Sequence, residues 1–598
     1  MQIVSEPALV GPPTSGNVTD HVEENANDFP HQQVFAREID GAWQSVSSTE
    51  FRETVRNVAK GLMADGIKPG DRVAIFSRTR YEWTVVDYAI WYAGGISVPI
   101  YETSSPEQVQ WMMSDANVVA TFFESKHVLA TFEEVASQLP EMTTRYVFSE
   151  DTLNGLAIRG HEISDEKLEE RRKLATPSDI ATIIYTSGTT GRPKGCVLTH
   201  SNFMAECDNL IALLPEIFRA PNASTLLFLP LAHIFGRMIQ IAMFRGRVVI
   251  GHCPNPSALL KQMQSLQPTF LLAVPRVFEK VFNTAVSNAH HDSALKGKIF
   301  ERSAQVSIAY SEALDHGRVS PLLKLRHTIY DRLVFAKLRA AMGGRVTHAI
   351  SGGASLGARL GHFYRGLGLT VLEGYGLTET TAGASLSSPK HLKIGSVGRP
   401  VPGTSTAIAD DGEVLLKGID IFKGYWNNED ATEEALNEDG WFHTGDIGKF
   451  DEDGYLYITG RKKELIVTAG GKNVAPAVLE DRLRANPIVS QCVVVGDAKP
   501  FIAALVTLDQ EALPNILAEH NIPNAPIEEL VIHKEVRTLV QQAINEANKA
   551  VSNSESIKKF IILPTDFTID NGYLTPKLSI KRHLVTTDFA NVIESMYQ

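Results

Sequence analysis

The stretch Tyr185–Gly195 carries residue types suited to phosphate binding in one uninterrupted run, YTSGTTGRPKG. Glycine allows positive φ and close backbone approach, so such a loop can aim its N–H groups and hydroxyls at one anion. A lysine adds a compact positive charge suited to phosphate. The alternative is an ordinary surface turn, since Gly, Ser and Thr also mark turns. We predict a phosphate loop made of Thr186, Ser187, Gly188, Thr189, Thr190, Gly191 and Lys194.

This loop does not match the Walker P-loop. That motif requires Gly-Lys followed by Ser or Thr, whereas Lys194 lies between Pro193 and Gly195. The run instead resembles the phosphate loop of the adenylate-forming superfamily, which includes acyl-CoA synthetases, aryl-CoA ligases, luciferases and peptide-synthetase adenylation domains. Further blocks in order along the chain extend the resemblance from about residue 30 to the C-terminus.

Three of these blocks match nucleotide-binding segments of the family: SGGASL at 351–356, EGYGLTET at 373–380, and DGWFHTGDIGKFDEDGYLYITGRKKE at 439–464. The last resembles the fatty-acyl-CoA synthetase signature almost throughout, and a charged surface hairpin would not explain an aspartate inside Thr-Gly-Asp-Ile-Gly. The resemblance implies that Asp446 binds both ribose hydroxyls and that Arg461 makes a second ribose or phosphate contact. It assigns the adenine and α-phosphate to Gly353, Ala354, Gly374, Tyr375 and Thr378, with Tyr375 stacked on the base.

A magnesium site is expected beside the phosphates. Mg²⁺ takes one or two carboxylates and keeps phosphate oxygens and water as its other ligands. Glu379 follows a glycine turn and would be an ordinary surface acid in the absence of a phosphate loop. The resemblance implies that Glu379 and Thr189 are the metal ligands, and that Lys194, Thr378 and Glu379 take part in catalysis.

The C-terminal segment LTPKLSIKR, 574–582, matches the hairpin in which the family carries a catalytic lysine. That lysine usually lies three residues after the proline, a position occupied here by Ser579. We favour Lys577, because a shift of two residues keeps a side chain on one face of a strand, and Lys581 is the alternative. By the same resemblance, Gly471 lines a pantetheine tunnel for CoA.

The acyl substrate is indicated by the block LPLAHIFGR, 229–237. His233 could be a base or a packed structural histidine, and the resemblance adds a third role as a ring that lines and gates the acyl pocket, together with Gly352. Peptide-synthetase domains place an Asp after the Phe of this block to hold an amine, whereas Gly236 follows Phe235 here. The block VPRVFEK, 274–280, and the helix-rich segment from 282 to about 342 resemble long-chain acyl-CoA synthetases.

Composition excludes several classes of function. The 598 residues carry a formal net charge of −12 with 43% hydrophobic residues, which argues against a nucleic-acid-binding surface. Four cysteines have no metal-like spacing and are too few for a disulfide framework. The N-terminus lacks a signal-peptide pattern, so a cytoplasmic protein is expected. Peripheral membrane association and a homodimer stay open.

Alternating strand and helix patterns predict an α/β fold in which helices pack on a large sheet. The resemblance to acyl-CoA synthetases implies a large multi-sheet body and a smaller, mobile α+β C-terminal domain. A capping box at Ser47–Glu50 predicts a helix over 51–64, and an all-round apolar pattern predicts a buried helix over 81–93. Residues 1–30 are expected to form a loosely held arm, 31–460 the adenylation domain, 461–463 a hinge that includes Lys463, and 464–598 the small domain.

The expected activity is that of a long-chain-fatty-acid–CoA ligase, which uses ATP, Mg²⁺ and CoA. A fatty carboxylate would attack the α-phosphate to give acyl-AMP and pyrophosphate, and the CoA thiol would then displace AMP. The alternatives are an aryl- or medium-chain acid ligase, a fatty-acyl-AMP ligase that delivers to a carrier protein, and a binding protein that keeps the fold without turnover.

Overall fold

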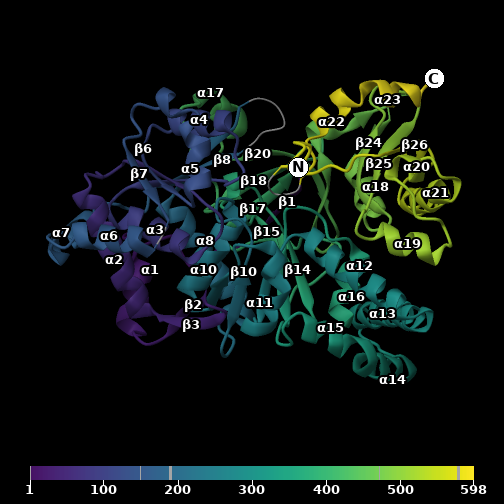
Figure 1. Cartoon of the computed structure of the whole chain (residues 1–598), viewed down its shortest axis with the longest axis horizontal. Coiled ribbons are helices and arrows are strands. Elements are labelled where there is room, and N and C mark those ends of the chain that lie inside the picture. The colour runs from purple at the N-terminus through teal and green to yellow at the C-terminus, as the bar shows by residue number, and fades with distance from the viewer. Residues whose placement is uncertain (1, 149, 187–191, 471, 576–578) are drawn as a thin grey trace.

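The structure is a computed structural model of residues 1–598, and it describes all of them except 1, 149, 187–191, 471 and 576–578. A large body runs from purple to green in Figure 1, and a smaller C-terminal domain, coloured yellow-green to yellow, lies at its upper right. The predicted α/β body and a smaller C-terminal domain are both present.

A seven-stranded sheet carries the phosphate-loop segment. Its inner strands are parallel and are joined through helices, which is the predicted strand–helix–strand pattern. The last inner strand turns back into an antiparallel partner, with Thr186 opposite Lys194. The strand order is β19 (Gly424–Tyr425), β9 (Lys194–Thr199), β8 (Ile180–Thr186), β5 (Ile96–Ile100), β4 (Arg72–Phe76), β6 (Val118–Phe123) and β7 (Thr144–Val147).

A nine-stranded sheet carries the two glycine-rich blocks. Its central strands are parallel, and the block SGGASL begins at the end of one of them while EGYGLTET begins at the end of the next. The strand order is β16 (Arg399–Pro400), β15 (Ser385–Leu386), β14 (Thr370–Tyr375), β13 (His348–Ser351), β12 (Phe270–Ala273), β10 (Ser224–Leu227), β11 (Val249–His252), β2 (Gln33–Ile39) and β3 (Ala42–Ser47).

Buried helices belong to one hydrophobic core with residues from both sheets. The capping box is confirmed, since Ser47 Oγ accepts from Glu50 N–H and the Glu50 carboxylate accepts from Ser47 N–H. The helix predicted to be buried all round has no exposed residue from Tyr81 to Tyr92. The helices of this layer include α2 (Ser48–Ala64), α3 (Tyr81–Tyr92), α8 (His200–Leu213) and α10 (Ile234–Arg245).

The first thirty residues do not form the loosely held arm that was expected. Residues 2–5 form an edge strand of a five-stranded antiparallel sheet, with Gln2 opposite Ile408. Helix α1 (Asp20–Asp28) buries His21 and Val22 against the body. Partners far along the chain thus order this segment. The strand order is β1 (Gln2–Ser5), β17 (Thr404–Ile408), β18 (Glu413–Gly418), β20 (Phe442–Phe450) and β21 (Leu456–Arg461).

The helix-rich segment predicted from 282 to about 342 projects at the lower right of Figure 1. It contains α12 (Pro275–Asp292), α13 (Ala294–Asp315), α14 (Pro321–Tyr330), the π-helical turn η3 (Asp331–Phe335) and α15 (Ala336–Ala341). With α16 (Ala358–Gly366), these helices share a second hydrophobic core with strands of the nine-stranded sheet. None of the helices in the described part of the chain is long and apolar enough to cross a membrane.

The C-terminal domain has two hydrophobic cores of its own, both built from residues after 465. Its sheet has the order β24 (Val489–Val495), β25 (Ile502–Leu508) and β26 (Ile557–Leu563), and a two-stranded ribbon, β22 (Ile466–Val467) and β23 (Asn473–Val474), precedes it. Its helices include α18 (Pro476–Arg484), α19 (Leu513–Glu519), α21 (Lys534–Asn548) and α22 (Arg582–Asp588).

Candidate active site

One cavity of about 2620 Å³ reaches residues of all three sheets of the body and of the C-terminal domain. Every predicted site residue that the structure describes lines it. These are Thr186, Lys194, His233, Gly352, Gly353, Ala354, Gly374, Tyr375, Thr378, Glu379, Asp446, Arg461 and Lys463. The predictions for Ser187, Gly188, Thr189, Thr190, Gly191, Gly471 and Lys577 fall outside the described residues. Lys581, the alternative to Lys577, lines the cavity, as does Ser579.

A tyrosine that the sequence reasoning missed links the predicted lysine and the predicted metal ligand. Lys194 Nζ lies 5.0 Å from the centre of the Tyr425 ring, and the Tyr425 hydroxyl donates to Glu379 Oε1 at 2.8 Å. Tyr425 is brought there by strand β19, in which it lies opposite Cys196 of β9. Burial and the Glu379 charge raise the pKa of Tyr425 well above its usual value, so its hydroxyl stays protonated and orients the carboxylate.

Two of the blocks predicted to bind the nucleotide meet at Asp446. Pairing of β20 with β21 sets Asp446 opposite Arg461, and Arg461 Nε lies 3.0 Å from Asp446 Oδ1. The Tyr375 hydroxyl donates to Asp446 Oδ2 at 2.7 Å. Burial raises the pKa of Asp446, and the charge of Arg461 acts in the opposite direction. Each carboxylate oxygen accepts more than one hydrogen bond, so Asp446 has acceptor capacity for ribose hydroxyls beside these two partners.

Glycines without side chains form part of the cavity wall. Gly353 has φ +83°, a backbone conformation that other residues rarely adopt. A Cβ at Gly352 would lie 3.3 Å from the Phe235 ring, and one at Gly374 would lie 3.0 Å from the Leu386 side chain. A flat ligand can therefore approach the backbone at 352–353, as the two adjacent glycines predict.

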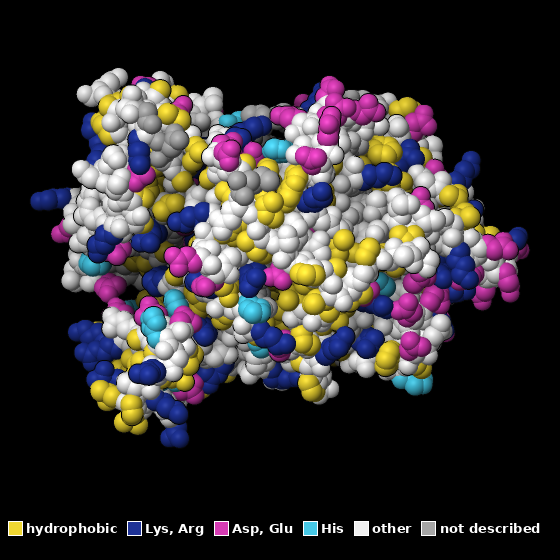
Figure 2. All heavy atoms as spheres, turned by 180° about the vertical axis from the view of Figure 1, so that it is seen from behind, with side chains coloured by type: hydrophobic (Ala, Val, Ile, Leu, Met, Phe, Trp, Pro, Cys, Tyr) yellow, Lys and Arg dark blue, Asp and Glu magenta, His cyan; other side chains and the backbone are white. Residues whose placement is uncertain are grey.

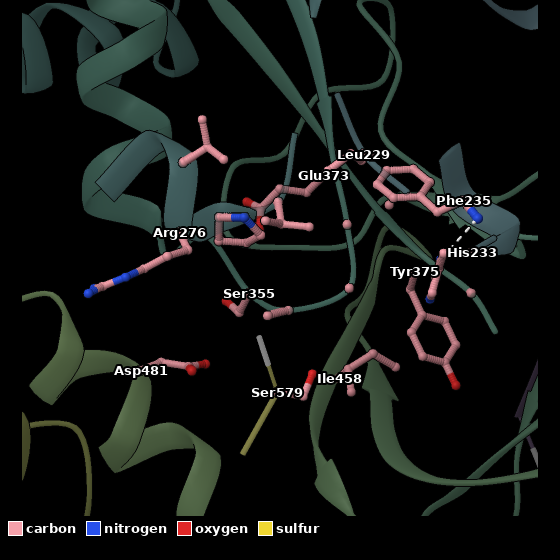
Figure 3. A pocket seen from close by; sticks show the side chains of 18 of the residues that line it. Leu229, His233, Phe235, Arg276, Ser355, Glu373, Tyr375, Ile458, Asp481 and Ser579 are labelled. Atoms are coloured by element: carbon pink, nitrogen blue, oxygen red, sulfur yellow. Dashed lines mark hydrogen bonds between the residues drawn. The ribbon is translucent and has the colours of Figure 1, made fainter. Parts of the chain in front are cut away.

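The apolar side of the cavity begins at His233 and Phe235. Figure 3 shows these two rings at one end of the view and Arg276 and Asp481 at the other. His233 caps α10, because its Nδ1 accepts from Phe235 N–H at 3.1 Å, and this bond places the proton of a neutral ring on Nε2. A Cβ at Gly236 would lie 2.8 Å from the carbonyl oxygen of Pro230. An amine-anchoring Asp therefore cannot occupy position 236 without a backbone shift.

A buried ion pair fixes α10 against the strand that leads into the phosphate loop. Arg237 is fully buried and contacts Asp87 through Nε at 2.9 Å and Nη2 at 2.6 Å. Its Nη1 donates to Thr182 Oγ1 on β8 at 2.7 Å. Removing one partner of such a pair costs about 3–5 kcal/mol. Arg237 thus positions the helix that carries His233, although the sequence reasoning singled out only the histidine in this block.

Two buried carboxyl groups, Glu206 and Asp420, lie beside residues 381–383, which follow Glu379. Glu206 lines the cavity, and within the described chain neither of its carboxyl oxygens has a hydrogen-bond partner. Burial and the charge of Asp420 raise the pKa of Glu206 well above its usual value. Burial raises the pKa of Asp420 to about 7, although Thr404 Oγ1 donates to its Oδ1. Two residues after Asp420, the Phe422 N–H donates a hydrogen bond to the Glu379 carbonyl oxygen at 2.8 Å.

The stability of the Asp420→Asn variant relative to the wild type is expected to increase as the pH rises. Between the ordinary carboxyl pKa, about 3.9, and the folded value the native state keeps a proton that the unfolded chain has lost. Stability therefore falls with rising pH through this window in the wild type, and the amide removes the dependence. Thermal unfolding at pH 5 and pH 8 measures it, with the exposed Asp439→Asn as the control. If Tm depended on pH in the same way in the wild type and in Asp420→Asn, the raised pKa of Asp420 would be contradicted.

Comparisons with known proteins agree with this arrangement. A model of the AMP-binding enzyme family matches residues 22–426, and a model of the AMP-binding enzyme C-terminal domain matches residues 463–598. Long-chain-fatty-acid–CoA ligase FadD15 of Mycobacterium tuberculosis is 48% identical over 601 residues that cover 100% of both chains. Long-chain-fatty-acid–CoA ligase ACSBG2 of Xenopus laevis is 30% identical over 96% of this chain and 83% of its own.

Solved structures share the fold. The anthranilate CoA ligase AuaEII in complex with anthranoyl-AMP superimposes with a TM-score of 0.72 at 18% identity, over 96% of this chain and 98% of its own. A Mycobacterium tuberculosis fatty acyl CoA synthetase gives a TM-score of 0.62 at 23% identity, over 96% and 99%.

Proposed function

Because this chain belongs to the AMP-binding enzyme family, we propose that it is a long-chain-fatty-acid–CoA ligase, which joins a fatty acid to CoA with cleavage of ATP to AMP and pyrophosphate. The observation that carries the proposal is the continuity of the cavity. At one end it contains Lys194, Glu379 and Asp446, and it continues without interruption to apolar residues of α12, α13 and α15. FadD15 and ACSBG2, the relatives named above, bear the same activity in their names.

In the first half-reaction the fatty carboxylate attacks the α-phosphorus of ATP, and the bond to pyrophosphate breaks. The carboxylate is already ionised at neutral pH, so this step needs no general base. The residues position the reactants and offset the negative charge that builds on the phosphate oxygens. In our proposal Lys194 and Thr378 contact those oxygens, and Asp446 holds the ribose.

Glu379 fits the role of a magnesium ligand. It is buried at the cavity wall beside Lys194, and Tyr425 orients its carboxylate. Among the described residues no three His, Cys, Asp or Glu side chains gather as a metal cage. Such a sparse site matches Mg²⁺, which takes one or two carboxylates and completes its shell with phosphate and water. With Thr189 as the second ligand, the ion would supply positive charge to the phosphate oxygens.

In the second half-reaction the CoA thiol attacks the acyl carbonyl carbon, and AMP leaves with the electrons of the broken C–O bond. We assign the CoA tunnel to the C-terminal domain around Gly471, and the adenylation lysine to the same domain, at Lys577 or Lys581. One domain cannot present both features to one carbonyl at the same time. The proposal therefore includes a rotation of this domain about residues 461–463.

The substrate preference tests the proposal directly. Saturated acids of about C12 to C18 should give the highest kcat/KM for acyl-CoA formation, since each buried CH₂ contributes ~0.8 kcal/mol until the pocket ends. A chain-length series with acetate, an amino acid and 4-coumarate as comparison substrates measures this. Best turnover of any of those three acids would contradict the long-chain assignment.

A further inference from the structure

Helix α14, the turn η3 and helix α15 form a surface ridge (321–341) with an unusual apolar face. Leu322, Leu325, Ile329 and Leu333 are 58%, 59%, 49% and 52% exposed. Their spacing of three, four and four residues places them along one side of a helical segment. A helix of a soluble protein ordinarily turns that side toward the core, whereas here it faces outward. Contiguous exposed apolar patches of this kind mark interaction sites.

The opposite side of the ridge is held firmly against the body. His327 Nε2 lies 2.6 Å from the carbonyl oxygen of Gly366, and its ring stacks on Tyr310 with centres 3.9 Å apart. Arg339 Nη1 donates to the carbonyl oxygen of Leu367 at 2.7 Å, and Phe335 is fully buried. The outward direction of the leucine side is thus set by packing and does not arise from a frayed helix.

The ridge is basic in an acidic protein. Four exposed Lys and Arg residues lie on it, and its one acid, Asp331, is paired with Arg339 at 2.7 Å, whereas the whole chain has a net charge of −12. Figure 2 shows dark blue and yellow side chains together on the projecting lobe at the lower left, where the ridge lies when seen from behind. Long basic side chains beside apolar ones suit an anionic lipid surface, since their stems pack on acyl chains while the charges meet headgroups. The exposed basic residues are Lys324, Arg326, Arg332 and Lys337.

The ridge also borders the cavity that holds the candidate active site. Leu333 belongs to both the exposed stripe and the cavity wall, and Val334, Lys337 and Leu338 line the same cavity. A path therefore leads from the leucine side of the ridge between α12, α13 and α15 toward His233 and Gly352. Long-chain acids partition into bilayers because their CH₂ groups leave water there, so a substrate of this class would be met at a membrane surface.

We infer that the ridge 321–341 docks on the surface of an anionic phospholipid bilayer and admits the fatty acid from it into the cavity. The inference rests on the proposed function for the identity of the substrate, while docking itself rests on the ridge alone. A second copy of the chain fits the ridge less well than an anionic bilayer does. A two-fold contact would set the four exposed basic residues of one ridge against those of the other.

The test compares vesicle binding with activity. The purified full chain should sediment with phosphatidylcholine vesicles that contain phosphatidylglycerol and much less with pure phosphatidylcholine, and salt should weaken binding. The double variant Leu325→Glu/Ile329→Glu should lose at least about tenfold in binding. The control Ile158→Glu/Leu174→Glu, at similarly exposed apolar positions on other elements, should bind as the wild type does.

Measurements of activity distinguish the docking of the ridge from the proposed ligase function. With palmitate carried by cyclodextrin, the ridge variant should match the wild type, and with palmitate in anionic vesicles it should be several-fold slower. Absence of wild-type turnover in cyclodextrin would count against the proposed function and leave vesicle binding as the measure of docking. Docking would be overturned if the wild-type protein did not bind anionic vesicles, or if the ridge variant bound them as well as the wild type does. A dimer that the ridge variant converts to monomer, with unchanged vesicle binding, would assign the ridge to self-association instead.

Discussion

Glu379→Gln should lower the rate of adenylate formation by about 10²–10³-fold, which corresponds to roughly 2.7–4 kcal/mol of lost transition-state stabilisation. The amide keeps the size of the side chain and can still accept from the Tyr425 hydroxyl, so the local packing should survive. It removes the charge that a magnesium ion requires. Pyrophosphate release in a single turnover, measured over a Mg²⁺ titration, should show both a lower maximum and a weaker dependence on the metal.

The matched control is Glu434→Gln, because Glu434 also lines the cavity but belongs to α17 (Glu429–Ala435) and lies outside the sequence blocks predicted to bind the nucleotide. It should retain the wild-type rate. An unchanged rate and an unchanged metal dependence in Glu379→Gln would remove this residue from the proposed magnesium site.

Lys463→Pro should separate the two half-reactions. Lys463 lies in the turn Lys462–Glu464 between the last strand of the body and the C-terminal domain. Proline fixes φ near −65° and restricts the preceding residue, so it should hold this joint in one conformation. Pyrophosphate release should largely survive, whereas thioester formation from supplied acyl-AMP should fall by about 10²-fold, as expected when reactants are misplaced.

Ion pairs at the surface are among the contacts between the body and the C-terminal domain that a rotation would break. Arg276 lies 3.5 Å from Asp509 in a half-buried pair, and Lys280 lies 3.0 Å from Glu511 in an exposed pair, both between α12 and the segment before α19. Exposed pairs contribute about 0–1 kcal/mol each. Lys463→Ala, which leaves the backbone free, is the control and should support both half-reactions. An equal and small loss in both half-reactions of Lys463→Pro would count against a hinge here.

Local sequence patterns predicted the parts of the site that lie on continuous segments. The glycines at 352–353 and the strand before the phosphate loop follow from patterns a few residues long, whereas Asp446 and Arg461 were implied by the resemblance and their pairing across β20 and β21 came only with the structure. Their convergence on one cavity was implied by family resemblance, because a motif alone does not fix which strand ends share an edge.

The contacts that the sequence did not reveal join residues far apart in the chain. Tyr425 meets Glu379 across 46 residues, and the electrostatic pair Glu206 and Asp420 is more distant still. The strand at Gln2–Ser5 pairs with a strand some 400 residues away. Neither periodicity nor turn chemistry encodes such pairings, so the sequence predicts a loose arm where the structure has a strand and a helix held by distant partners.

The most direct measurement of the central claim is a trapping experiment with labelled palmitate. The wild-type protein is mixed with MgATP and labelled palmitate in the absence of CoA, and the reaction is quenched with acid. Our account predicts labelled palmitoyl-AMP and pyrophosphate in amounts close to that of the enzyme. In a parallel sample that receives a chase of CoA and excess unlabelled palmitate before the quench, this label should move into palmitoyl-CoA. Formation of ADP and phosphate, or return of the label to free palmitate during the chase, would contradict the proposed two-step ligase.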